Sequence, residues 1–123
     1  MKSFLKMLFV AGTFAGVSVF SLAVVQDDVQ AEPLVASYYG YELAGSPTAS
    51  GVPFDPSALT AAHKTLPLGT QLLVTYGGES VVVTVNDRGP YVAGRELDLS
   101  QAAADTIGLT AAGSGVVDVQ VVE

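Results

Sequence analysis

The sequence contains no cysteine and no tryptophan, and its only histidine is His63. Without cysteine the chain can form neither a disulfide nor a thiol-linked lipid anchor, so a compact apolar core must hold the fold. Zinc sites draw three or four ligands, mostly from Cys and His. A zinc site here would have to recruit carboxylates such as Asp87 and Asp98. We therefore expect no metal and no other cofactor.

Basic residues are also scarce. The chain has five Lys and Arg residues against twelve Asp and Glu residues, which gives a formal net charge of −7 at pH 7. Only Lys64, Arg88 and Arg95 lie beyond residue 31. Nucleic acids and anionic lipids are bound mainly through clustered Lys and Arg side chains. The charge balance therefore argues against nucleic acid and against anionic membrane surfaces as partners.

The N-terminal segment has the pattern of a secretory signal peptide. Lys2 and Lys6 are followed by an uncharged stretch from Met7 to Val25, and Val29-Gln30-Ala31 offers a small-residue cleavage site. This pattern predicts a signal peptide over residues 1–31 and an exported domain over residues 32–123, secreted or periplasmic within the cell envelope and free of the membrane after cleavage. Because the apolar run approaches the length that spans a bilayer, an uncleaved anchor is the alternative.

Short runs of β-forming residues dominate the rest of the chain. The segments expected to be strands are 34–41, 70–76, 79–86, 97–99 and 116–122, with 60–63 extended or coiled. Gly77-Gly78 predicts a two-residue hairpin turn. Asp55-Pro56 indicates one short helical turn, and Ser100 and Gly108 bracket a helix over 101–107. Since closure removes vulnerable strand edges, we predict an all-β fold, a small closed barrel with one or two short helices.

The segment Asn86-Asp87-Arg88-Gly89-Pro90 comes directly after the β-forming run 80–85. A strand therefore delivers a carboxylate and a guanidinium to a turn that Gly89 and Pro90 make sharp. Rigid scaffolds often present catalytic groups where a strand meets a loop. The alternative reading is structural, with Asp87 capping its own turn and Arg88 as a solvated neighbour.

Five ordered segments carry a family resemblance that covers nearly all of residues 32–123. They are Ala-Ser-Tyr-Tyr-Gly at 36–40, Thr-Ala-Ser-Gly at 48–51, Ala-Leu-Thr-Ala-Ala-His-Lys-Thr-Leu-Pro-Leu-Gly-Thr at 58–70, Val-Thr-Val-Asn-Asp-Arg-Gly-Pro at 83–90 and Gly-Arg-Glu-Leu-Asp-Leu-Ser at 94–100. The series resembles the rare lipoprotein A-like family of bacterial cell-envelope proteins. The resemblance implies a six-stranded double-psi β-barrel. It also implies lytic transglycosylase activity on peptidoglycan glycan strands, with 1,6-anhydro-muramic ends as product.

The resemblance also suggests which residues carry out the reaction. It places an essential Asp at Asp87, a supporting His at His63 and a further functional Asp at Asp98. One carboxyl group can serve first as acid and then as base, and burial or a second nearby carboxylate would favour the protonated form that it needs. The structural alternatives are that Asp98 caps the helix or holds an arginine, and that His63 makes an ordinary hydrogen bond. The expected substrate-binding residues are Tyr39, Thr48, Ser50, Arg88 and Tyr91.

The chain departs from the family pattern at Val52, because the enzymes carry Glu directly after the Thr-Ala-Ser-Gly segment. A valine side chain can neither ionise nor accept a hydrogen bond, so its presence should weaken or abolish catalysis. Two other functions stay open beside a secreted transglycosylase. One is a non-catalytic module that binds glycan strands, and the other is an interaction protein such as a secreted protease inhibitor. We expect a monomer in each case.

Overall fold

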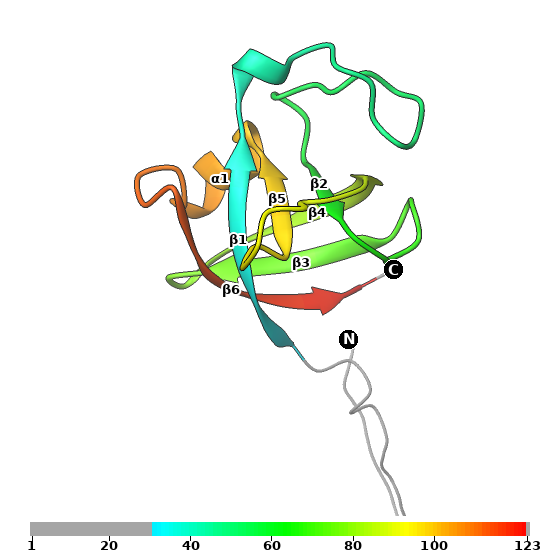
Figure 1. The fold of residues 1–123 in the computed structure, drawn as a ribbon. Coiled ribbons are helices and arrows are strands. Elements are labelled where there is room, and N and C mark those ends of the chain that lie inside the picture. The colour runs from blue at the N-terminus through cyan, green and yellow to red at the C-terminus, as the bar shows by residue number, and fades with distance from the viewer. Residues whose placement is uncertain (1–30, 123) are drawn as a thin grey trace, which may run out of the picture. The chain divides into compact units, whose positions relative to one another are not determined.

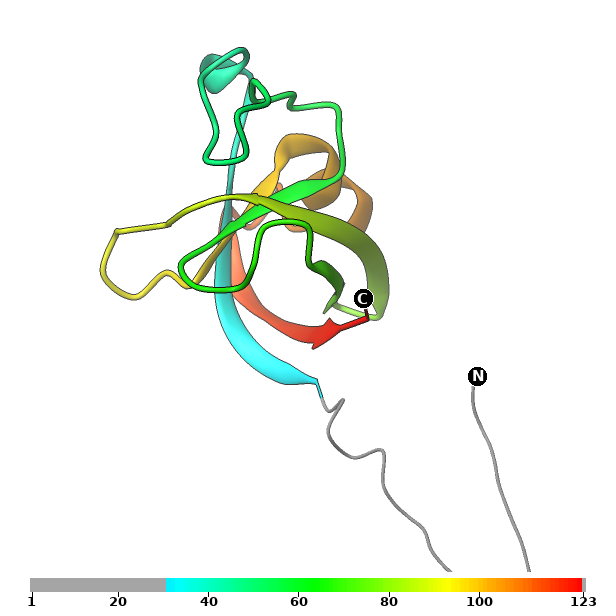
Figure 2. The same ribbon diagram turned by 90° about the vertical axis from the view of Figure 1, so that its right-hand side faces the viewer.

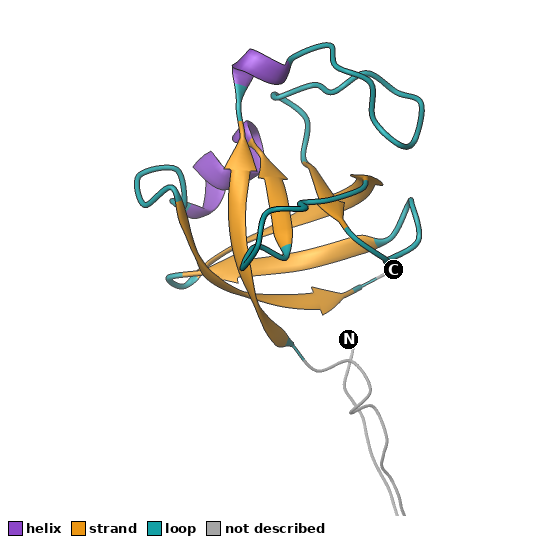
Figure 3. Ribbon diagram, in the orientation of Figure 1, coloured by secondary structure: helices purple, strands orange, loops and turns teal. Residues whose placement is uncertain are grey.

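The structure is a computed structural model that describes residues 31–122, and residues 1–30 of the predicted signal peptide lie outside this range. Six strands close into a barrel (Figures 1 and 3). The strands are β1 (Glu32–Tyr39), β2 (Thr60–His63), β3 (Gln71–Tyr76), β4 (Glu79–Asp87), β5 (Leu97–Ser100) and β6 (Ser114–Val121). A 3-10 helix η4 (Tyr41–Leu43) comes after β1, and the α-helix α1 (Gln101–Ile107) comes after β5. The predicted six-stranded barrel is confirmed.

The barrel is a mixed sheet with the order β1-β5-β2-β4-β3-β6 around its wall. The pairs β1–β5 and β2–β4 are parallel, and the other four pairs are antiparallel. Parallel partners must be reached by a crossover, so each of these pairs joins distant parts of the chain. Helix α1 lies on one side of the barrel, and the loop between β4 and β5 lies on the opposite side (Figures 1 and 2).

The interior of the barrel is filled by alternate residues of each strand. On β4, Val81, Val83 and Val85 point inward, and the other strands contribute leucines such as Leu72 and Leu97, which are completely buried. Burying a side chain of this size stabilises the fold by roughly 1.5–3 kcal/mol. The apolar core and the closed wall therefore provide the stability that disulfides provide in many exported domains.

The local turn and cap predictions are confirmed at two places. Gly77 and Gly78 join β3 to β4 with φ of 57° and 86°, values that β-branched residues resist. Helix α1 begins after Ser100, whose side chain accepts a hydrogen bond from the backbone N–H of Ala103, and it ends at Gly108 with φ of 80°.

Two other predictions are wrong in detail. The first strand ends at Tyr39 rather than Tyr41, because the chain turns into η4 after Gly40. Asp55 starts a turn rather than a helix: its Oδ1 accepts the backbone N–H of Ser57 at 2.9 Å and the Ser57 hydroxyl at 2.6 Å. This local bonding satisfies the turn without a helical continuation. No helix among residues 31–122 is long and apolar enough to cross a membrane.

Candidate active site

Asp87 ends β4, and a bulge in that strand sets its position. Ala61 of β2 pairs with Val85, but Ala62 pairs with Asp87, so Asn86 is the extra residue on β4. A bulge of this kind shifts the side-chain alternation by one residue and re-aims the side chains beyond it. It places Asp87 in the same cross-strand row as Ala62.

Three hydrogen bonds hold the Asp87 carboxylate. Its Oδ1 accepts the backbone N–H of Ala49 at 2.9 Å and the backbone N–H of Arg88 at 2.8 Å. Its Oδ2 accepts the hydroxyl of Tyr39 at 3.3 Å. The two oxygens are therefore unequal, because Oδ1 carries two donors and Oδ2 carries one.

The side chain of Arg88 binds backbone oxygens rather than the Asp87 carboxylate. Its Nη1 donates to the carbonyl oxygens of Leu66 at 2.8 Å and His63 at 3.2 Å. Arg88 therefore fixes the start of the loop between β2 and β3. Its predicted part in substrate binding stays a prediction, and it would have to use the remaining N–H groups of the guanidinium.

Asp98 lies on β5, on the other side of Ala62. Ala62 pairs with Asp98 across β2 and β5 and with Asp87 across β2 and β4, so the two aspartates share one row with a single strand between them. At the usual strand spacing their backbones are about 10 Å apart. The register therefore brings both aspartates to one region of the barrel wall.

The environment of Asp98 is that of a structural ion pair. Nη2 of Arg95 donates to Oδ1 at 2.9 Å and to Oδ2 at 2.8 Å, and the hydroxyl of Ser37 on β1 also donates to Oδ1. Within residues 31–122 this is the only ion pair. The structure supports the open alternative that Asp98 holds an arginine, and it identifies Arg95 as that partner.

The Tyr39 hydroxyl is influenced by the charges of both carboxylates. Burial of the ring is the main cause that raises the pKa of Tyr39 far above its usual value of 10.0, and the charges of Asp87 and Asp98 raise it further. The ring packs against Phe54 with centroids 4.6 Å apart and an interplanar angle of 39°. Tyr39 therefore stays a neutral phenol that donates or accepts hydrogen bonds and does not act as a base.

His63 is held by the loop that comes after β2. Its Nδ1 accepts the backbone N–H groups of Thr65 and Leu66, each at 3.1 Å. Partial burial lowers the pKa of His63 below 6.5, and the positive charge of Arg88 lowers it further. The ring is accordingly assigned as neutral with its proton on Nε2. No hydrogen bond joins it to Asp87 or Asp98 in the described structure.

The loop that carries Thr48, Ser50 and Val52 is attached to the end of β4. In addition to the bond from Ala49 to Asp87, the N–H of Ser50 donates to the carbonyl of Asn86 at 3.0 Å. The Thr48 hydroxyl is buried, contacts Ser50 Oγ at 2.8 Å and donates to the carbonyl of Val52. These hydroxyls shape the loop, and their predicted contact with substrate stays a prediction.

Two exposed side chains border this region. Val52 is 59% exposed, so the position at which the family resemblance implies Glu opens to solvent on the loop that binds Asp87. Tyr91 is 77% exposed, and its ring lies over Gly89, where an added Cβ would meet it at 3.7 Å. Tyr91 is therefore free to pack against a ligand, and its predicted contact with substrate stays a prediction.

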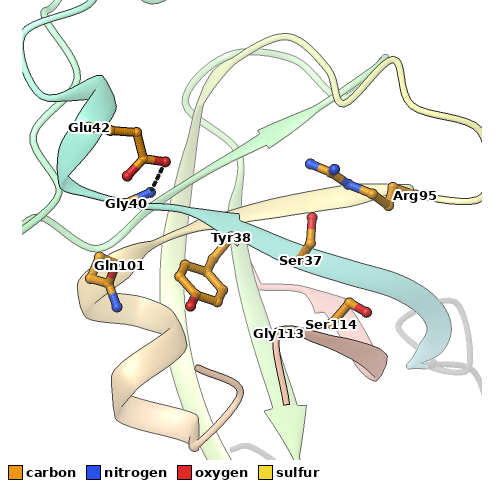
Figure 4. A pocket seen from close by; sticks show the side chains of 8 residues that line it. All are labelled: Ser37, Tyr38, Gly40, Glu42, Arg95, Gln101, Gly113 and Ser114. Atoms are coloured by element: carbon orange, nitrogen blue, oxygen red, sulfur yellow. Dashed lines mark hydrogen bonds between the residues drawn. The ribbon is translucent and has the colours of Figure 1, made fainter. Parts of the chain in front are cut away.

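A hollow of about 540 Å³ lies along β1 (Figure 4), and neither Asp87 nor Asp98 is among the residues that line it. Ser37 and Arg95, the two partners of Asp98, both line it. Its other lining residues are Tyr38, Gly40, Glu42, Gln101, Gly113 and Ser114. Within residues 31–122, no cluster of three or more His, Asp and Glu side chains could hold a metal ion.

Sequence reasoning missed Ser37 and the contact between Tyr39 and Phe54. Ser37 and Tyr39 are two residues apart on β1, so strand alternation puts both on one face and could have suggested Ser37 once Tyr39 was chosen. No sequence signal links Phe54 to Tyr39, because the contact depends on how the loop folds back.

Comparison with known proteins identifies the family. A family model described as lytic transglycolase matches residues 31–121. The probable endolytic peptidoglycan transglycosylase RlpA of Synechocystis sp. is 50% identical over 91 residues, which cover 72% of this chain and 28% of that protein. The endolytic peptidoglycan transglycosylase RlpA of Yersinia pestis is 54% identical over 78 residues, 62% of this chain and 22% of that protein.

The chain thus spans about a quarter of the length of these two relatives. Among solved structures, the Streptomyces papain inhibitor superposes with a TM-score of 0.63 at 26% identity, covering 76% of this chain and 96% of that one. The match to the family model covers every element of the barrel from β1 to β6. The chain belongs to the RlpA-like double-psi β-barrel family.

Proposed function

We propose that this protein is a lytic transglycosylase that cleaves peptidoglycan glycan strands in the cell envelope, with Asp87 as the acid and base. The observation that carries the proposal is the Asp87 carboxylate itself. It is half-buried at the end of β4, held by three hydrogen bonds, and paired with no basic side chain in the described structure. The identity of about 50% to proteins named as endolytic peptidoglycan transglycosylases supplies the substrate class.

The proposed chemistry needs one carboxyl group. Protonated Asp87 gives its proton to the glycosidic oxygen, and the C1–O bond breaks with its electron pair leaving on that oxygen. The 6-hydroxyl oxygen of the same sugar bonds to C1, and its proton returns to Asp87. No water is consumed, so the product is a 1,6-anhydro end.

His63 takes the part of a hydrogen-bond donor in this proposal. Because its Nδ1 is occupied by two backbone N–H groups, only Nε2–H is available to a ligand. Asp98 contributes its charge at a distance and holds the loop through Arg95. The reaction is expected to be slow, because Val52 supplies no carboxylate where the enzymes have one.

The test measures anhydro-sugar products by mass after incubation of the purified protein with peptide-free glycan strands. Asp87→Asn should lower the product rate by about 10²- to 10⁴-fold, the usual worth of acid–base catalysis. Asp118→Asn, at an exposed position on β6, is the matched control and should keep the wild-type rate. Val52→Glu should raise the rate, and because Val52 is largely exposed the change should leave folding intact.

Other results select the other functions. Retention of glycan strands without products would identify a binding module, for which the exposed Tyr91 is the first candidate contact. Inhibition of a papain-type protease without glycan binding would identify an inhibitor, in line with the Streptomyces papain inhibitor. The higher identity to the transglycosylases favours the enzyme over the inhibitor.

Export is part of the same proposal. We propose that residues 1–31 are removed as a signal peptide and that the domain acts as a monomer outside the cytoplasm. N-terminal sequencing of the exported protein should begin at or near Glu32. Recovery of Met1 in a membrane fraction would instead support the uncleaved anchor.

A further inference from the structure

The hydrogen bonds that Asp87 accepts leave few positions on its carboxyl group where a proton can bind. An ionised carboxylate offers about four lone-pair directions. Ala49 N–H and Arg88 N–H occupy two of these on Oδ1, and the Tyr39 hydroxyl occupies one on Oδ2. A proton on Oδ1 would face two donors that cannot turn around, because a backbone N–H only donates. The remaining direction on Oδ2 is the place for an exchangeable proton.

Tyr39 is held rigidly enough to determine where on Oδ2 the proton can lie. Its backbone lies on β1 in register with Ser100, and its ring packs against Phe54, which is 3% exposed. A tyrosine hydroxyl has one donor and acceptor capacity, so it can adjust to either state of the carboxyl group. Its neighbour on β1, Tyr38, bonds elsewhere, with its hydroxyl 3.5 Å from the carbonyl of Thr110.

We propose that Tyr39 is a positioning residue for Asp87, which holds one side of Oδ2 so that the proton on that oxygen points outward to a glycosidic oxygen. The inference rests on the proposed function of Asp87. In the step described above, the proton leaves from Oδ2 and returns to Oδ2, while Tyr39 donates to that oxygen when it is charged.

The charged groups around Tyr39 support this assignment. Asp87 and Asp98 are the two carboxylates whose charges act on its hydroxyl. Arg95 is bound to Asp98, and Arg88 is bound to the carbonyls of His63 and Leu66. His63 responds to Arg88, Glu96 and Lys64. Asp87 is the only one of these charged groups that the Tyr39 hydroxyl contacts in the described structure, at 3.3 Å from Oδ2.

The experiment compares Tyr39→Phe with Tyr38→Phe, the same chemical change on the neighbouring residue. Tyr39→Phe should lower the rate of anhydro-product formation by about 10- to 100-fold, the range for a hydrogen bond to a charged group. Removing this donor disfavours the ionised carboxyl group, so the alkaline limb of the rate profile should move to higher pH. Tyr38→Phe should stay within about twofold of wild type with the same profile.

A second readout does not depend on activity. In protein labelled with ¹³C at tyrosine Cζ, the Tyr39 signal is assigned by its loss in Tyr39→Phe and is then compared between variants at neutral pH. Since the Tyr39 hydroxyl donates to Oδ2 of Asp87, Asp87→Ala removes its acceptor and should move the Tyr39 Cζ chemical shift away from the wild-type value. Asp118→Asn should leave this chemical shift unchanged.

The outcomes separate the two ideas. A Tyr39→Phe variant with the wild-type rate and profile, or one that loses activity only as much as Tyr38→Phe with an unmoved profile, overturns the positioning role. An unchanged Tyr39 Cζ chemical shift in Asp87→Ala also overturns it, whether or not wild type makes product. Absence of product from wild type, together with a changed Tyr39 Cζ chemical shift in Asp87→Ala, overturns the proposed function and supports the contact.

Discussion

Asp87 and Asp98 have the same side chain and flank the same residue, Ala62, yet their surroundings differ. Asp98 is 7% exposed and is bound by the guanidinium of Arg95 and the hydroxyl of Ser37. Asp87 is half-buried and is bound by two backbone N–H groups and a phenol, all of them neutral. A cation fixes one carboxylate, while dipoles hold the other in place.

The difference shows how two aspartates on the same barrel can be suited to different roles, one to stability and the other to proton transfer. The ion pair of Asp98 with Arg95 holds two segments together, β5 and the loop before it. Asp87 is held in position by neutral donors alone, so no cationic side chain occupies its oxygens. This contrast makes Asp87 the better candidate for proton transfer and Asp98 the better candidate for stability.

The largest stability effect should separate the two aspartates. Asp98→Ala leaves the guanidinium of Arg95 without its partner and should lower the free energy of unfolding by about 2–3 kcal/mol, below the value for a fully buried pair because Arg95 is one-third exposed. Asp87→Ala should cost about 1 kcal/mol, because water can reach the donors that it leaves. Urea unfolding of both variants tests the order, and a larger loss for Asp87→Ala would contradict it.

A smaller effect should come from the hydroxyl that supports Asp98. Ser37→Ala removes one of the donors to Oδ1 and should cost about 1 kcal/mol of unfolding free energy. The matched control is Ser114→Ala, because Ser114 is exposed and pairs with Ser37 across β1 and β6. That variant should stay within about 0.5 kcal/mol of wild type. Equal losses in the two variants would show that the Ser37 hydroxyl adds nothing to the ion pair.

The smallest effect is a change in the pKa of His63, which tests whether this side chain interacts electrostatically with Asp87. Burial and the charge of Arg88 lower the pKa of His63, so NMR titration should place it below 6.5 in wild type. Arg88→Gln removes that charge and should raise the pKa of His63. Asp87→Asn should leave it in place. A clear change in the pKa of His63 in Asp87→Asn would show that the two side chains interact electrostatically, and the site would then have to be described as a pair rather than as Asp87 alone.

The lowered pKa of His63 also makes the stability of the protein depend on pH. The unfolded chain binds the proton more readily than the folded protein, so unfolding free energy should decrease as pH falls through 6.5 toward the folded-state pKa. His63→Gln should flatten this part of the stability profile. A profile of equal slope in His63→Gln would assign the pH dependence to other groups.

Features that depend on neighbours in sequence could be predicted. The alternation at Val81, Val83 and Val85 predicts a strand with one buried face, and Gly77-Gly78 predicts the turn before it, because both signals are local. The same holds for the cap at Ser100. The number of short strands predicts the barrel, whereas only the family resemblance predicts its double-psi topology.

The details of the site could not be predicted in this way. The bulge at Asn86 decides which face Asp87 joins, and nothing in the sequence marks it. By sequence alone Arg88 is as good a partner for Asp98 as Arg95, but in the fold Arg88 binds carbonyl oxygens instead. Such choices depend on which distant segments the barrel brings together.

The bonds that orient Asp87 also determine when the site can exist. Tyr39 and Ala49 are 48 and 38 residues away from it in sequence, so neither contact forms until the end of β1 and the loop after it have reached the end of β4. Contacts of such long range form late because the chain must first lose the entropy of loop closure. A partly folded chain therefore carries Asp87 without its alignment, and chemistry that depends on this carboxylate begins only when the barrel has closed.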